Sequence, residues 1–245
     1  MIDWKETSNR FIAFIDIMGF SNYVYRNEHS VVKKRMNKLQ SILEDTEKKI
    51  NDLKKDTLKS ESIKSVIFSD SILLITKGNS EDDLKTILFT CQVFLTNCII
   101  DKIPIKGAIS YGTLTADFNK SLFFGKALID SYNLQEELFM YGIVLDYKIE
   151  KQLLKKKDAG NGYCIQCKTP TKSGNITHYN IDWMCWHNTM NDLKKIKDPN
   201  DVEKLRLKID KPTAIKAIQE FYTDMSGYPR KYLDNTIDFI NNASA

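Results

Sequence analysis

The stretch RFIAFIDIMGFSNYVY, residues 10–25, decides the fold and contains the first candidate for chemistry. Its apolar run from Phe11 to Ile15 predicts a buried strand, and Asp16 ends that strand. A carboxylate is costly to bury without a partner, so an acid at this place needs a cation or a hydrogen-bond donor. Gly19 then leads into a helix, whose first amides are free to bind phosphate. The stretch predicts a combined metal and phosphate site; the alternative is an ordinary strand that ends in a helix-capping Asp.

A second acid lies in the segment SVIFSDSILLIT, residues 65–76. Apolar runs flank Ser69-Asp70-Ser71, which predicts a tight β-hairpin with Asp70 at its tip. If this hairpin pairs beside the first strand, Asp16 and Asp70 meet at one end of a sheet. Two carboxylates there suit Mg²⁺ or Mn²⁺, because these hard cations prefer oxygen ligands.

Four segments in order resemble the class III nucleotidyl cyclases. They are FIDIMGFS, FSDSILL, IKGAISYG and FFGKALIDSYNLQEE. The last two are most similar to the bacterial pyrimidine (uridylate and cytidylate) cyclases of the Pycsar antiphage systems. The resemblance covers more than half of the chain.

This resemblance implies roles for particular residues. Asp16 and Asp70 would hold two Mn²⁺ or Mg²⁺ ions, with the backbone carbonyl of Ile17 as a further ligand. The amides that would cradle the β- and γ-phosphates belong to Gly19, Phe20 and Ser21. Lys106 would be a catalytic cation for phosphate or base; the alternative is a surface lysine at a strand start.

The implied activity is the conversion of UTP to 3′,5′-cyclic UMP and pyrophosphate, as a second messenger in antiphage defence. In this reaction the 3′-hydroxyl attacks the α-phosphorus and pyrophosphate leaves. One alternative is a cytidylate cyclase that makes cyclic CMP from CTP. Another is a non-catalytic nucleotide-binding regulator of the same fold, and a third is a zinc-stabilised nucleic-acid-binding protein.

The chain departs from the family pattern in three places. After the glycine that matches Gly125, the family's Asn and Arg positions are occupied by Ile129 and Asn133. The usual transition-state arginine is therefore absent, and Lys106 or Lys126 would have to replace it if the chain is catalytic. Val66 stands where purine cyclases carry a lysine that reads adenine, which weighs against an ATP cyclase.

Class III sites form between two subunits, so one cyclase-like domain implies a head-to-tail homodimer with sites at its interface. The partner-side candidates for nucleotide binding are Lys126, Asp130 and Asn133. Asp130 and Asn133 are three residues apart and share a helix face. The alternative for this pair is a polar outer face.

Composition limits the function classes. The 245 residues are 42% hydrophobic and 28% charged, which suits a domain with a sizeable core. The net charge of +4 argues against a dedicated nucleic-acid binder. The polar run after Met1 predicts no signal peptide, and no uninterrupted apolar segment predicts a membrane span. Five cysteines in mostly apolar settings favour free thiols in the cytoplasm.

A cysteine and histidine group has the elements of a zinc site. Its members are Cys164, Cys167, His178, Cys185 and His187. The first two lie three apart in a predicted strand, so their side chains point to opposite faces. This spacing argues against zinc and favours structural cysteines.

The predicted elements follow the order β-α-β-β-α-β-(β)-α-β. This order is typical of an α+β fold with a ferredoxin-like core, an antiparallel sheet backed by helices. We expect a catalytic core over 1–148 and a C-terminal β-hairpin and helical extension over 149–245, packed on that core. Helices are expected over Ala127–Met140, Asn188–Lys197, Pro199–Ile209 and Pro212–Asn242.

Overall fold

The structure, a computed structural model, describes residues 4–54, 62–155, 162–184, 211–224 and 226–242. An eight-stranded sheet runs through them in the order β2-β3-β1-β4-β6-β8-β7, and β5 pairs with β4 beside this path. The strands are β1 (Thr7–Ile17), β2 (Ile63–Phe68), β3 (Ser71–Thr76), β4 (Ile105–Asp117), β5 (Leu122–Phe124), β6 (Gly142–Leu145), β7 (Cys164–Thr171) and β8 (Gly174–Ile181). β4 and β6 are parallel and the other neighbours are antiparallel. The predicted α+β class and ferredoxin-like element order are therefore confirmed.

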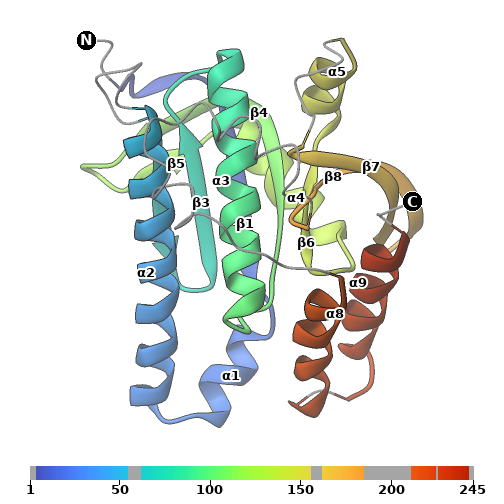
Figure 1. Ribbon diagram of the computed structural model, residues 1–245. Coiled ribbons are helices and arrows are strands. Elements are labelled where there is room, and N and C mark those ends of the chain that lie inside the picture. The colour runs from blue at the N-terminus through green and yellow to red at the C-terminus, as the bar shows by residue number, and fades with distance from the viewer. Residues whose placement is uncertain (1–3, 55–61, 156–161, 185–210, 225, 243–245) are drawn as a thin grey trace.

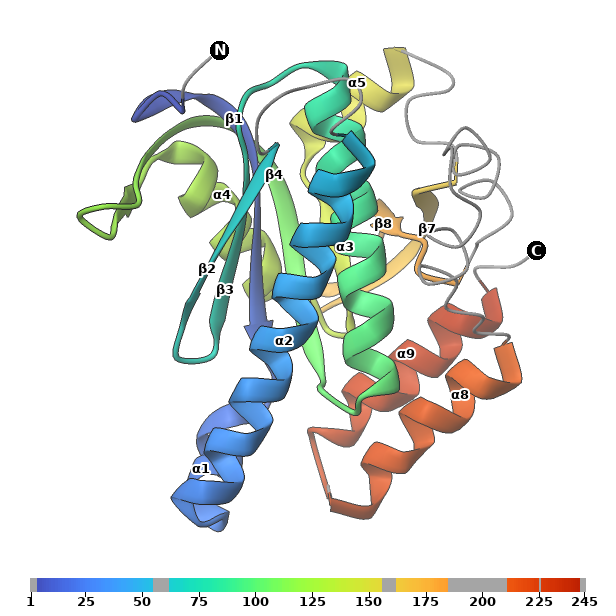
Figure 2. The same cartoon turned by 60° about the vertical axis from the view of Figure 1, so that its left-hand side comes forward.

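Helices cover both faces of the sheet. They are α1 (Phe20–Arg26), α2 (His29–Lys54), α3 (Glu81–Ile100), α4 (Lys126–Glu137), α5 (Tyr147–Lys155), α8 (Lys211–Gln219) and α9 (Arg230–Asn242), with a 3₁₀ turn, η1 (Glu220–Asp224). Figures 1 and 2 show α2 and α3 on one face and α4 on the other. Alternate residues of β1 serve the two cores, because side chains alternate along a strand. Phe11 and Ile15 belong to the α2–α3 side, whereas Ile12 belongs to the α4 side.

Helix α3 forms the centre of the larger core. Ser80 caps it, and Asp83 completes a capping box by accepting from the Ser80 amide at 2.9 Å. Among the described residues this is the one helix long and apolar enough to cross a membrane, and 72% of its apolar window is buried inside the protein. Such burial is that of a core helix.

Two expected helices have different bounds from those predicted. The helix expected over Ala127–Met140 ends at Glu137, since Leu138 adopts extended backbone and forms a bridge with Thr171. The segment Pro212–Asn242 is not one helix, because the chain turns at Gly227 (φ 68°) between η1 and α9. The helices expected over 188–197 and 199–209 lie outside the described residues.

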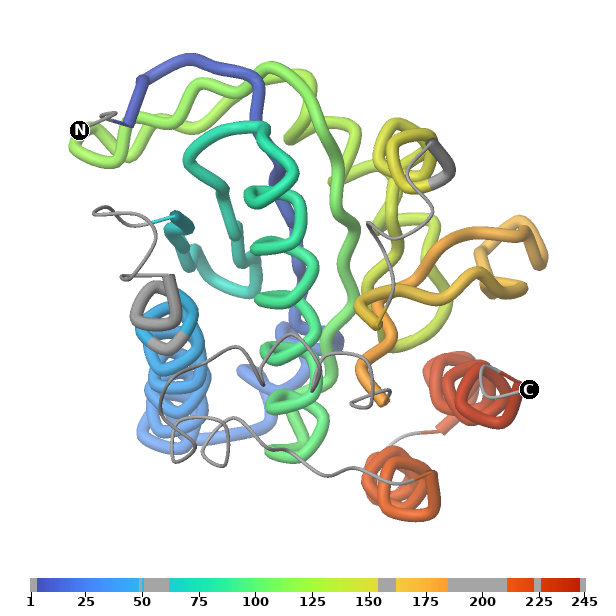
Figure 3. Tube along the Cα trace, turned by 45° about the horizontal axis from the view of Figure 1, so that its top comes forward, coloured from blue at the N-terminus to red at the C-terminus, as the bar shows by residue number. Residues whose placement is uncertain are grey.

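The C-terminal hairpin continues the sheet of the core. Asn180 of β8 pairs with Val144 of β6, so β8 and β7 extend the same sheet. Helix α9 contacts β7 of this extension, and α8 packs beside α9, as Figure 3 shows. The described part of 149–245 thus packs on the preceding residues, while the boundary at 148 stays a prediction.

Candidate active site

The two acids of the site come together because β1 is a central strand. Asp16 lies opposite Ser71 of β3 on one side and opposite Lys106 of β4 on the other. The Ile17 amide donates to the Asp70 carbonyl at 2.9 Å, which fixes the hairpin tip beside the end of β1. The hairpin with Asp70 at its tip is confirmed.

A left-handed turn follows β1 directly. Gly19 has φ 71° and ψ 15° and precedes α1, a conformation that glycine adopts without strain. The Met18 amide donates to the Pro104 carbonyl at 2.8 Å, which ties the turn to the start of β4. The amides of Phe20 and Ser21 lie in the first turn of α1 and have no intrahelical acceptor. They are available to an anion.

Asp16 lies in an unfavourable place for a negative charge. Burial, the largest cause, and the charges of Asp70 and Glu136 together raise the pKa of its carboxyl to about 6, while Lys106 acts in the opposite direction. This carboxylate is half-buried beside a second acid, so a cation placed there would be strongly stabilised.

Lys106 is almost fully buried, with 3% of its surface exposed. The alternative of a surface lysine is therefore wrong. Burial lowers the pKa of Lys106, and Glu136 and Asp16 act in the opposite direction. Its Nζ lies 3.8 Å from Oε1 of Glu136, an ion pair too long to be a hydrogen bond.

The residues present fit a divalent cation. The Asp70 carboxylate is close enough to Asp16 to raise its pKa, and the Asp70 backbone is hydrogen-bonded to Ile17, so the electrostatics at this sheet end favour a positive charge. No group of three or more His, Cys, Asp and Glu side chains in the described ranges is placed to hold a metal. Two carboxylates suffice for Mg²⁺-type ions, which complete their coordination with water and substrate phosphates.

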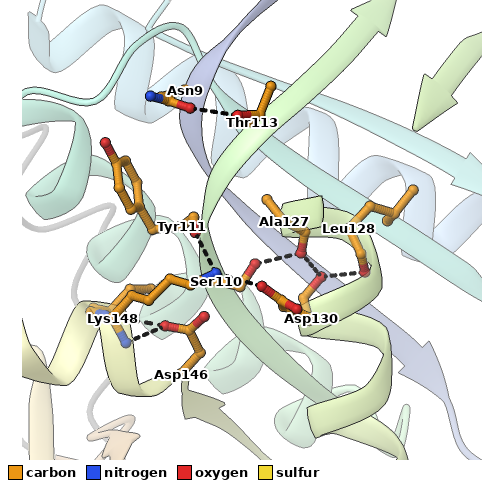
Figure 4. Close-up of polar contacts among 11 residues, drawn as sticks. Asn9, Ser110, Tyr111, Thr113, Ala127, Leu128, Asp130, Asp146 and Lys148 are labelled. Atoms are coloured by element: carbon orange, nitrogen blue, oxygen red, sulfur yellow. Dashed lines mark hydrogen bonds and ion pairs between the residues drawn. The ribbon is translucent and has the colours of Figure 1, made fainter. Parts of the chain in front are cut away.

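The predicted partner-side residues lie elsewhere on the same chain. Lys126 and Asn133 of α4 are exposed, whereas Asp130 is paired with Nζ of Lys148 at 2.5 Å. Figure 4 shows this pair beside Tyr111. Tyr111 is five residues from Lys106 on β4, roughly 16 Å at about 3.3 Å per residue. Asp130 is therefore far from Asp16 within one chain, whereas Asn133 lies one helical turn before Glu136, the α4 residue that reaches Lys106. The role of all three residues in a dimer stays a prediction.

Sequence reasoning missed two charged residues near these groups. Glu136 reaches Lys106 from the last turn of α4, and Lys148 of α5 neutralises Asp130. The motif FFGKALIDSYNLQEE contains Glu136, but its spacing does not tell which of three adjacent polar side chains faces the sheet. Lys148 lies outside the four motif segments, so no sequence signal indicated it.

The zinc group is only partly described. Cys164 packs on the α3 side and Cys167 on the opposite side of the sheet, which confirms the expected divergence of the two cysteines. Nδ1 of His178 lies 2.8 Å from Glu150. Cys185 and His187 lie outside the described residues.

Similar structures are found although no protein-family model and no curated protein matches the sequence. The core of a rhodopsin-guanylyl cyclase with converted specificity, in complex with ATPalphaS, superposes with a TM-score of 0.55 at 14% identity. It covers 72% of this chain and 98% of that one. The adenylyl cyclase CyaB from P. aeruginosa gives 0.52 at 11% identity, covering 72% and 96%. A bacterial light-regulated adenylyl cyclase gives 0.51 at 12% identity, covering 78% and 98%.

The chain has the class III cyclase fold. At these identities the likeness establishes the fold alone. Within this class III cyclase fold, Asp16, Asp70 and the Gly19 turn gather at one end of the sheet.

Proposed function

We propose that this chain is a metal-dependent nucleotide cyclase that acts on a pyrimidine nucleoside triphosphate. The observation that carries the proposal is the meeting of Asp16 and Asp70 at one sheet end, next to the Gly19 turn. The similar structures include an adenylyl cyclase and a guanylyl cyclase core, which supports the reaction class.

The reaction forms a bond between the 3′-oxygen and the α-phosphorus and breaks the bond from that phosphorus to the leaving pyrophosphate. The proton of the 3′-hydroxyl goes to solvent. Asp16 and Asp70, with the carbonyl of Ile17, would hold two Mn²⁺ or Mg²⁺ ions, which supply charge stabilisation at the attacking and leaving oxygens. The first amides of α1 would bind the terminal phosphates, and the buried Lys106 ammonium would be a catalytic cation for phosphate or base.

The finer parts of the proposal rest on the resemblance to Pycsar enzymes. We infer UTP as substrate, with cyclic UMP as an antiphage second messenger, and CTP as the alternative. Val66 lies in β2 at the position of the adenine-reading lysine, so no cation is present there to bind adenine.

We further propose a head-to-tail homodimer. Lys126, Asp130 and Asn133 of one protomer would then face the nucleotide held by its partner. This arrangement would account for the distance of Asp130 from Asp16 within one chain.

The experiment measures pyrophosphate release with Mn²⁺ from ATP, GTP, CTP and UTP in turn. We expect release from UTP, reduced at least about 100-fold by Asp70→Ala, because a lost metal ligand removes transition-state charge stabilisation. Asp45→Asn, an exposed acid on α2, is the matched control and should keep wild-type activity. Release from a purine triphosphate alone would contradict the pyrimidine assignment.

A non-catalytic nucleotide-binding regulator is the second candidate. Asn133, an exposed amide where the family has an arginine, is the observation that favours it. Thermal stabilisation by UTP and Mn²⁺ without pyrophosphate release, from dimeric protein, would establish this regulator in place of the enzyme.

A further inference from the structure

The ion pair between Lys106 and Glu136 has a consequence for the metal site. Lys106 and Asp16 lie opposite each other on adjacent strands, so their side chains stand on the same face of the sheet. The Lys106 ammonium is buried and needs a counter-charge. Two acids could supply this counter-charge, Asp16 on β1 and Glu136 on α4.

In the structure, Glu136 supplies the counter-charge. Nζ of Lys106 lies 3.8 Å from Oε1 of Glu136, whereas no ion pair within 4.0 Å joins it to Asp16. Glu136 is itself held in place. Nε2 of Gln135 donates to its Oε1 at 2.9 Å, and Nζ of Lys172 donates to its Oε2 at 3.3 Å.

The backbone around Glu136 is anchored by the C-terminal extension. The Lys172 amide donates to the Glu137 carbonyl at 2.8 Å, and the Phe139 amide donates to the Pro170 carbonyl at 3.0 Å. From α9, Nδ2 of Asn235 donates to the Phe139 carbonyl at 2.7 Å. The hairpin and α9 therefore fix the end of α4 from two sides.

We propose that Glu136 is a positioning residue that holds the Lys106 ammonium away from Asp16 and so keeps Asp16 free to bind a divalent cation. This inference rests on the metal site of the proposed function. Without the Glu136 charge, the nearest acid for the buried ammonium is Asp16. Lys106 would then compete with the cation for the same carboxylate, because both interact with it by charge.

Binding of Mn²⁺ alone, followed by electron paramagnetic resonance without nucleotide, tests this competition directly. We expect Glu136→Gln to weaken Mn²⁺ binding about five-fold, a typical effect of one nearby charge. Adding Lys106→Met to that variant should restore wild-type affinity or better, because the competing cation is gone. Glu137→Gln, an exposed neighbour, is the matched control and should bind like wild type.

The outcomes separate this inference from the proposed function. Unchanged Mn²⁺ affinity in Glu136→Gln would overturn the positioning role, as would a loss that Lys106→Met does not restore, since a structural defect would persist. Absence of Mn²⁺ binding in the wild type, or binding that survives Asp70→Ala, would instead overturn the metal site and the proposal that depends on it. Circular dichroism melts of each variant verify that all of them are folded.

Discussion

The ionised carboxylate of Asp16 destabilises the folded state. Burial raises the pKa of its carboxyl to about 6, above the value of the unfolded chain. The folded protein therefore loses stability as pH rises from about 4 to about 6, because it must release a proton that it binds more tightly than the unfolded chain does. Above that window the penalty is constant.

Replacement of Asp16 by Asn removes this penalty. We expect Asp16→Asn to raise the free energy of unfolding by about 1–2 kcal/mol at pH 8 in EDTA, after allowing for partial exposure. The gain should vanish near pH 4, where the wild-type carboxyl is protonated. Urea denaturation at both pH values measures it. Equal stability of the two proteins at pH 8 would contradict the burial of a charge at this position.

At the scale of elements, Gly107 lets β1 and β4 approach at the site. A Cβ at residue 107 would lie 2.8 Å from the Phe14 carbonyl oxygen and 2.9 Å from Cγ1 of Ile15. Gly107→Ala should therefore lower the free energy of unfolding by about 2–3 kcal/mol, the cost of overpacking, and reduce pyrophosphate release. Gly112→Ala on the same strand meets Ala127 at an ordinary 3.6 Å and should stay within about 0.5 kcal/mol of wild type. Equal melts of the two variants would contradict the close approach at Gly107.

Local patterns predicted the elements whose ends are set locally. The turn at Ser69 and Asp70 follows from flanking apolar runs, which lie next to it in the sequence. The end of α4 is different, since the bridge from Leu138 to Thr171 joins residues far apart in sequence. The burial of Lys106 could not be predicted from local sequence either, because its counter-charge, Glu136, comes from another element.

At the scale of the whole molecule, apolar side chains are exposed on the α4 helix. Ile129 is 59% exposed and Tyr132 is 47% exposed. Phe68, beside the Asp70 turn, is 80% exposed. Large exposed apolar side chains are typical of protein–protein contacts, and a second copy of this chain would cover them in the proposed homodimer.

If each site is formed by two protomers, two inactive variants should complement each other in a mixed dimer. Asp70→Asn removes a proposed metal ligand, whereas a Lys126→Glu and Asn133→Asp double variant alters only the proposed partner side. Each protein alone should be inactive. Mixed one to one and allowed to exchange, half of the dimers are mixed and each holds one intact site of two, so about a quarter of wild-type pyrophosphate release should return.

The pyrophosphate release recovered in the mixture distinguishes a site shared between two protomers from a site built within one chain. Recovery requires that the carboxylates and the α4 residues of a single site come from different protomers. Mixed dimers can be isolated by two affinity tags, so failure to exchange is detected separately. If isolated mixed dimers stay inactive, each site is built within one chain. Lys126 and Asn133 would then contact the nucleotide held by their own protomer, or no nucleotide. Because Lys126 lies ten residues before Glu136 on α4, about 15 Å at 1.5 Å per residue, recovery is the outcome that fits the position of Lys126 in the fold.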